Sequence, residues 1–142
     1  MPEAFESIYT ITGRDFSNAG KVSTSIKETL KRLGLNPAVV RRIAIVSYEA
    51  EMNLVMYAVQ GKIQLTVSPE TVTINVQDNG PGIPDIELAM QEGYSTATPE
   101  MREMGFGAGM GLPNIRKNAD DFNINSEVGQ GTQLCIRVHQ TL

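Results

Sequence analysis

A glutamate and an asparagine four residues apart are the first residues whose types could carry out chemistry together. Glu49 and Asn53 belong to the segment EAEMN, and a separation of four residues places two side chains on one face of a helix. The carboxylate can act as a base or orient a water molecule, and the amide oxygen can ligate a phosphate-bound Mg²⁺. The alternative is a solvated helix face. Glu51 lies on another side of the same helix and is expected to be only exposed.

A loop with two glycines and two prolines, DNGPGIPD, follows an alternating apolar segment. Its first residue, Asp78, only accepts hydrogen bonds when ionised, so it can select a ligand with an exocyclic amine such as adenine N6. Gly80 and Gly82 would let the backbone approach a flat base closely, and the prolines restrict the shape of the loop. The alternative is a rigid surface turn without a ligand.

A run of alternating glycines, GFGAGMG, precedes a predicted helix. Free backbone N–H groups and the positive end of a helix dipole favour phosphate binding at such a place. The run is not a P-loop, because it lacks the lysine, and it is not a Rossmann turn, because the usual strand-to-helix setting is missing. The alternative is a flexible loop. The glycines of the run are Gly105, Gly107, Gly109 and Gly111.

The hydrophobic pattern predicts the elements that must position these groups, because alternation predicts strands and recurrence at three or four residues predicts helices. The expected elements are a strand over 5–12, a helix from Asp15 to about Gly34, a helix that starts at Pro37 after the N-cap Asn36 and stops before Gly61, a hairpin of strands over 62–68 and 71–78, a short helix over 86–93, a helix over 112–120, and a hairpin of strands over 121–128 and 132–139. Helices that are grouped rather than alternating with strands indicate an α+β fold. We expect two layers, a mixed sheet with helices on one face.

Length and composition limit the possible functions. A chain of 142 residues is expected to form one domain over 1–142. The net charge of -4 argues against a domain that binds nucleic acid. No apolar stretch reaches the roughly 18 residues of a membrane span, so we expect a cytoplasmic protein that does not bind a membrane. Cys135 is the only cysteine and is expected to be an inert thiol in the core.

The order of these motifs resembles that of one ATPase superfamily. The pair Glu49 and Asn53, then DNGPGI, then GFGAGMGL, then Gly131 and Thr132 are similar to the four nucleotide-binding boxes of the GHKL ATPases. That superfamily includes gyrase, histidine kinases and mismatch-repair ATPases, and the resemblance covers about residues 15–140. It implies the Bergerat ATP-binding fold, in which ATP lies between the helices and the open end of the sheet under a lid.

The resemblance also implies how the nucleotide would be held. Asp78 would bind adenine N6, Gly82 would line the base, and Thr132 would assist through a water molecule. On the phosphate side, Asn53 would ligate Mg²⁺ and Glu49 would activate the attacking hydroxyl or water. The glycine run from 105 to 111 would form the lid that wraps the phosphates.

Within the superfamily, the chain resembles the stand-alone anti-sigma-factor serine kinases of bacteria, including the switch kinases of the stressosome pathway. A histidine kinase would need a dimerisation helix with a phosphoacceptor histidine, and we expect His139 to be incidental. Arg102 lies where related small kinases place a phosphate-binding arginine. The resemblance implies that the chain is a serine/threonine protein kinase, which uses Mg²⁺ and ATP to phosphorylate a STAS-domain anti-sigma antagonist.

Two further expectations concern partners. Some members of this group also hold a sigma factor or activate a regulatory phosphatase, so the alternative function is a nucleotide-gated binding module with little phosphotransfer. A homodimer is expected through the first strand and helix, because the family resemblance places that contact there and FESIYT offers an apolar strand edge.

Overall fold

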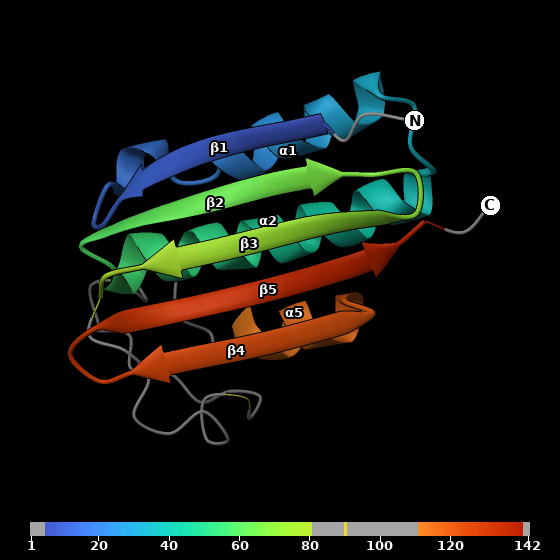
Figure 1. The fold of residues 1–142 in the computed structure, drawn as a ribbon. Coiled ribbons are helices and arrows are strands. Elements are labelled where there is room, and N and C mark those ends of the chain that lie inside the picture. The colour runs from blue at the N-terminus through green and yellow to red at the C-terminus, as the bar shows by residue number, and fades with distance from the viewer. Residues whose placement is uncertain (1–4, 81–89, 91–110, 141–142) are drawn as a thin grey trace.

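The computed structural model describes residues 5–80, 90 and 111–140 (Figure 1). The elements in chain order are β1 (Phe5–Thr12), the 3-10 turn η1 (Phe16–Asn18), α1 (Lys21–Arg32), α2 (Pro37–Tyr57), β2 (Gln60–Val67), β3 (Thr71–Asp78), α5 (Gly111–Asn118), β4 (Asp121–Glu127) and β5 (Gly131–His139). The strands and helices expected within these residues are therefore confirmed with small shifts of their ends, except that the first helix begins at Lys21 and not at Asp15. The short helix expected over 86–93 lies outside the described residues, apart from Met90.

The strands form one five-stranded sheet in the order β1-β2-β3-β5-β4. Every neighbouring pair is antiparallel, so the expectation of a mixed sheet is wrong, although the α+β class is confirmed. The reason lies in the connections between strands. The helix pair after β1 returns the chain to the end of the sheet where β1 stops, and β5 separates β3 from β4, which run in the same direction (Figure 1).

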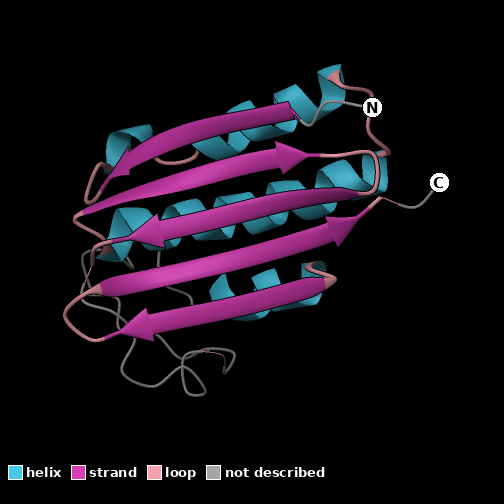
Figure 2. Cartoon of the chain, viewed as in Figure 1, coloured by secondary structure: helices cyan, strands magenta, loops and turns pink. Residues whose placement is uncertain are grey.

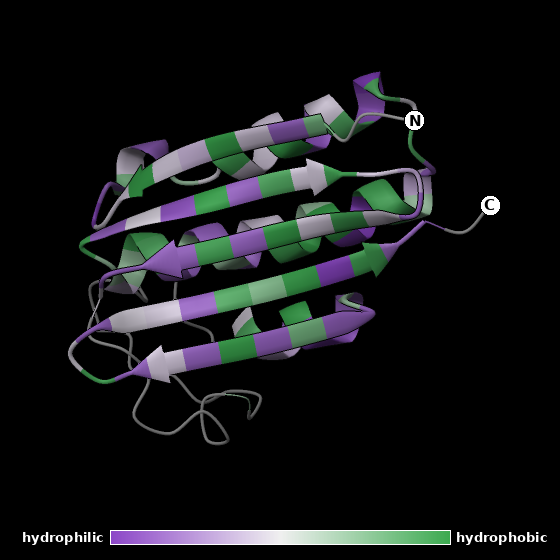
Figure 3. Ribbon diagram, viewed as in Figure 1, coloured by the Kyte–Doolittle hydropathy of each residue, from purple (hydrophilic) through white to green (hydrophobic). Residues whose placement is uncertain are grey.

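The helices cover one face of the sheet, and the core lies between these two layers (Figure 2). Side chains alternate along each strand, so one set from β2, β3 and β5 faces the helices and is fully buried. The members of this set include Ile63, Leu65, Ile74 and Ile136. The other face is mostly polar, and the alternation is visible along the strands in Figure 3. One face of the sheet therefore packs against the helices and the other is open. The candidate site residues lie on the helices and at the ends of the strands.

Cys135 lies on the polar face of the sheet and is half-buried. Its neighbours across the sheet are Asn75 on β3 and Asn123 on β4. The expectation of a core thiol is wrong, because Leu134 and Ile136 point inward from β5 and the residue between them must point outward.

The first helix begins later than its apolar pattern predicts. A single 3-10 turn follows Asp15, whose carboxylate accepts hydrogen bonds from Ser17 Oγ at 3.1 Å and Asn18 Nδ2 at 2.8 Å. Gly20 then has a φ of 95°, in the left-handed region that favours glycine, and α1 starts only at Lys21. The local hydrogen bonds of Asp15 thus replace the first helical turn that the spacing of apolar residues predicts.

The long helix α2 starts as expected. Asn36 caps it by accepting a hydrogen bond from Ala38 N at 2.8 Å, and Pro37 occupies the first helical position. α1 and α5 both pack against α2, which therefore forms the middle of the helical layer (Figure 1). Among the helices that the structure describes, none is long and apolar enough to cross a membrane.

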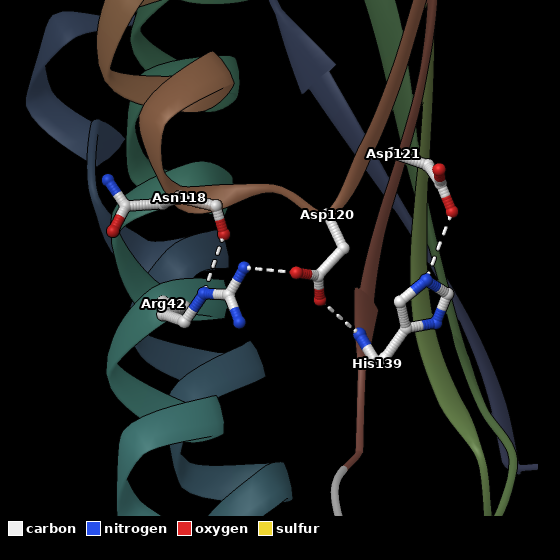
Figure 4. A network of polar contacts seen from close by, with 5 residues as sticks. All are labelled: Arg42, Asn118, Asp120, Asp121 and His139. Atoms are coloured by element: carbon white, nitrogen blue, oxygen red, sulfur yellow. Dashed lines mark hydrogen bonds and ion pairs between the residues drawn. The ribbon is translucent and has the colours of Figure 1, made fainter.

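A polar network joins α2 to the far end of the sheet (Figure 4). Arg42 donates from Nε to the carbonyl oxygen of Asn118 at 2.9 Å and pairs with Asp120 at 3.1 Å. Asp120 also accepts a hydrogen bond from the backbone N–H of His139 at 2.7 Å. This bond and the Arg42 contact outweigh desolvation and lower the pKa of the Asp120 carboxyl. His139 Nε2 lies 3.2 Å from Asp121 Oδ2, so the only histidine has a local partner.

Candidate functional site

Glu49 and Asn53 meet the start of α5. Asn114 Nδ2 donates a hydrogen bond to Glu49 Oε2 at 3.5 Å, a long contact. A methyl group added at Gly111 would lie 3.2 Å from Asn53 Oδ1 and 3.6 Å from Glu49 Oε2. The two side chains therefore share one face of α2, as their spacing predicts, and that face is directed at the N-terminus of a second helix. The glycine at this place leaves room beside both oxygens that a side chain would fill.

Burial changes the proton affinity of Glu49. Desolvation raises the pKa of this carboxyl above its ordinary value, and the hydrogen bond from Asn114 opposes the effect only in part. A carboxylate with a raised pKa binds a proton more strongly once it is ionised, which suits a general base. The raised pKa also means that the folded protein is less stable with Glu49 ionised than with Glu49 protonated. At neutral pH the ionised form therefore lowers the free energy of unfolding.

Glu51 is buried, not exposed as the sequence suggested. Its side chain is 1% exposed and accepts three backbone hydrogen bonds at the start of α1. The donors are Gly20 N at 2.9 Å, Val22 N at 3.2 Å and Ser23 N at 2.8 Å. N–H groups in the first turn of a helix have no intrahelical partner, so a carboxylate from α2 supplies the cap that Gly20 cannot. This tertiary use of a helix cap has no local signature in the sequence.

The end of β3 forms the second part of the candidate site. Asp78 Oδ1 accepts hydrogen bonds from Gly80 N at 2.8 Å and Thr132 N at 3.3 Å. Within the described residues both of these hydrogen bonds go to Oδ1, and Asp78 is half-buried. Thr132 Oγ1 lies 2.8 Å from Ser126 Oγ. The two backbone N–H groups thus hold Oδ1 of Asp78 in place.

Two glycines allow the strand ends to meet here. Gly131 has a φ of 129°, and a Cβ atom at this position would lie 2.0 Å from the carbonyl oxygen of Asp78. A Cβ atom at Gly80 would lie 2.9 Å from the carbonyl oxygen of Tyr57, the last residue of α2. Tyr57 lies two helical turns, about 12 Å, beyond Glu49. The C-terminal half of α2 therefore connects the Glu49 end of the site with the Asp78 end.

The structure brings together only part of the predicted site. Within the described residues it places Glu49, Asn53 and Gly111 together, and Asp78, Gly80 and Thr132 together. The other predicted site residues, Gly82, Arg102, Gly105, Gly107 and Gly109, lie outside the described residues. Sequence reasoning missed Asn114, which contacts Glu49. Its position in the first turn of the helix after the glycine run was the available signal.

The fold and the site geometry agree with the comparison with known families. The model of the histidine kinase-, DNA gyrase B-, and HSP90-like ATPases matches residues 38–142. This range holds both parts of the candidate site and most of the chain. The chain belongs to this family of ATPases, and the resemblance drawn from the ordered motifs is confirmed.

Similar individual proteins narrow the group. Serine/threonine-protein kinase RsbT of Bacillus subtilis (strain 168) is 32% identical over 112 residues, which are 76% of this chain and 78% of the relative. The anti-sigma F factor of Thermoanaerobacter sp. (strain X514) is 35% identical over 89 residues, which are 59% of each chain. The anti-sigma F factor of Heyndrickxia coagulans is 39% identical over 72 residues, which are 51% of this chain and 46% of the relative. The chain thus matches about three quarters of the kinase and about half of the anti-sigma factors.

Proposed function

We propose that this chain is an ATP-dependent serine/threonine protein kinase of the anti-sigma-factor type, and that it phosphorylates a STAS-domain regulatory partner in the cytoplasm. The observation that carries the proposal is the Glu49 carboxylate, with its raised pKa, on the same helix face as Asn53 and against the start of α5. ATP binding alone would not need a base at this place. The similarity to a serine/threonine-protein kinase over most of both chains supports the same reaction.

The residues present fit Mg²⁺ and the phosphates of ATP. Asn53 offers an amide oxygen, the kind of ligand that Mg²⁺ accepts beside phosphate oxygens. The described residues contain no group of three or more His, Cys, Asp or Glu that could hold a metal by itself, so Asn53 and the nucleotide would hold the ion together. The ion would neutralise phosphate charge. Glu49 would accept the proton of the serine or threonine hydroxyl as the phosphoryl group is transferred.

The other end of the site would bind adenine. The second oxygen of Asp78 would accept from adenine N6, while Gly80 and Gly82 would let the backbone approach the base and Thr132 would assist through a water molecule. The N–H groups at the start of α5 and the glycines at 105, 107, 109 and 111 would bind phosphate oxygens. We assign a further phosphate contact to Arg102.

A second candidate function is a nucleotide-gated binding module. Two of the similar proteins are named anti-sigma F factors, which favours a role in holding a sigma factor or another regulator. The partner in that case would be a sigma factor or a regulatory phosphatase. β1 is an edge strand of the sheet, with Ile8 64% exposed, and we keep the homodimer through β1 and α1 as part of both proposals.

The experiment that tests the kinase is intact-mass spectrometry. The chain is incubated with Mg²⁺, ATP and a STAS-domain protein encoded beside it. The partner should gain the mass of one phosphate on a serine or threonine, and this chain should gain none on His139. His139 lies at the opposite end of β5 from Thr132, about 23 Å away, and it contacts Asp121. ATP binding without any transfer to candidate partners would favour the binding module.

Nucleotide affinity should depend on Asp78. In Asp78→Asn, the amide NH₂ faces either the N–H groups of Gly80 and Thr132 or the adenine amine, so one acceptor contact is lost. We expect the binding free energy of a non-hydrolysable ATP analogue to weaken by about 1 to 3 kcal/mol, as measured by calorimetry. Asp121→Asn is the matched control, since Asp121 is at the far end of the sheet. Equal affinities for wild type and Asp78→Asn would reject the adenine assignment.

A further inference from the structure

A groove of about 920 Å³ runs along the outer side of the helical layer. α2 forms its floor, and residues of α1 and α5 form its walls. Its floor is largely apolar and includes Val40, Ala44, Ile45 and Tyr48, of which Tyr48 is 46% exposed. A large exposed aromatic side chain in a groove is typical of a site that binds another molecule.

The two ends of the groove differ in charge. Lys31 of α1 and Arg41 of α2 line one end, Lys27 lies one turn of α1 nearer the other end, and all three are exposed. The other end reaches Glu49 and Asn114, the pair that meets in the candidate site. Among the described residues that line the groove, Glu49 is the only acidic one. Three positive charges on a chain with a net charge of -4 form a local patch that favours an acidic ligand.

We infer that this groove binds a segment of the protein substrate that has acidic residues at one end and apolar residues between these and the acceptor serine or threonine. The inference rests on the proposed function, because it uses Glu49 as the residue that meets the acceptor hydroxyl. The apolar floor takes the middle of the segment. The groove therefore selects the substrate. Because its lining reaches Glu49, a segment bound in the groove would have its serine or threonine hydroxyl beside the Glu49 carboxylate.

The length of the groove sets the number of residues between the acidic residues and the acceptor of the substrate. Arg41 and Glu49 are eight residues apart on α2, which corresponds to about 12 Å along the helix. An extended segment advances about 3.3 Å per residue, so it covers this distance in about four residues. The acidic residues of the substrate should therefore lie about four residues from the acceptor.

The test measures peptide binding by fluorescence polarisation. The probes are fluorescein-labelled peptides with one serine, three apolar residues and then two aspartates, made in both chain directions, and the same peptides with two lysines in place of the aspartates. They are titrated with wild type and with the double variant Lys31→Glu/Arg41→Glu. Lys62→Glu/Arg137→Glu is the matched control, because it has the same charge change on the opposite face of the sheet.

One aspartate peptide should bind wild type and the control alike, and should bind Lys31→Glu/Arg41→Glu at least about tenfold more weakly. The corresponding lysine peptide should show the reverse preference. The inference is overturned if neither aspartate peptide binds wild type, if the groove variant and the control lose affinity equally, or if the groove variant instead abolishes concentration-dependent self-association, which would assign the groove to a second copy. Peptide binding does not need phosphotransfer. A kinase that transfers phosphate but is indifferent to these peptides would therefore refute the groove alone.

Discussion

Glu49→Gln should bind ATP normally and transfer phosphate at least about 100-fold more slowly than wild type. The glutamine keeps the size of the side chain and an oxygen that can accept from Asn114, but it cannot take the proton of the attacking hydroxyl. The measurement is the rate of phosphate gain on the partner under saturating ATP, together with calorimetry of an ATP analogue. A variant that transfers phosphate at the wild-type rate would refute the assignment of Glu49 as the base.

The same variant should not be less stable than wild type at neutral pH. The folded-state pKa of Glu49 is raised, so its contribution to stability is fully present below its unfolded pKa and is lost as the pH rises through the folded pKa. At pH 7 a neutral glutamine removes the desolvation cost of the ionised Glu49 carboxylate. The melting temperature of Glu49→Gln should equal or exceed that of wild type at pH 7, and a clear decrease would show that lost activity reflects misfolding.

Glu51→Ala should destabilise the fold by about 3 kcal/mol, because three N–H groups at the start of α1 would lose their charged acceptor inside the protein. Denaturant unfolding measures this loss. Glu51→Gln keeps one acceptor oxygen and should fall between wild type and Glu51→Ala. Glu28→Ala is the matched control on the exposed side of α1 and should change stability by less than about 0.5 kcal/mol.

Glu51 also has a consequence for the site. Successive residues of a helix are rotated by about 100°, so Glu51 points away from Glu49 and Asn53 on either side of it in the sequence. Because Glu51 ties α2 to the start of α1, we expect it to help fix the rotation of α2 and so the direction of the other two side chains. Glu51→Gln should therefore weaken ATP binding slightly even where it remains folded. An unchanged ATP affinity in folded Glu51→Gln would contradict this positioning role.

The strands and helices that hold the site could be predicted because their apolar residues repeat with clear periods. The helix face shared by Glu49 and Asn53 follows directly from the spacing of the two residues. Asp78 at a strand end follows from the alternation of β3 and the glycines and prolines after it. Local pattern is enough in these cases, since each depends on residues that are near in sequence.

Other features depend on contacts between distant residues. The antiparallel pairing of all neighbouring strands depends on the position of β5 between β3 and β4. No local sequence pattern contains this information. Glu51 has the same local surroundings as an exposed helix residue, and only the packing of α1 on α2 makes it a cap. Asn114 becomes part of the site because the start of α5 packs against α2. Asn114 and Glu49 are 65 residues apart in the sequence. Such contacts are tertiary and override local expectation.

We expect the nucleotide to bind where the C-terminal half of α2 meets the end of β3 and the start of β5. Amide chemical shifts measured by NMR, with and without Mg²⁺ and a non-hydrolysable ATP analogue, test it most directly without changing the protein. The amide signals of Gly80 and Thr132, which donate to Asp78, and the side-chain amide of Asn53 should shift strongly. Signals of Asn75 and His139, on the polar face and at the far end of β5, should stay in place. Shifts confined to the polar face, or no shifts at all, would rule out nucleotide binding at this place.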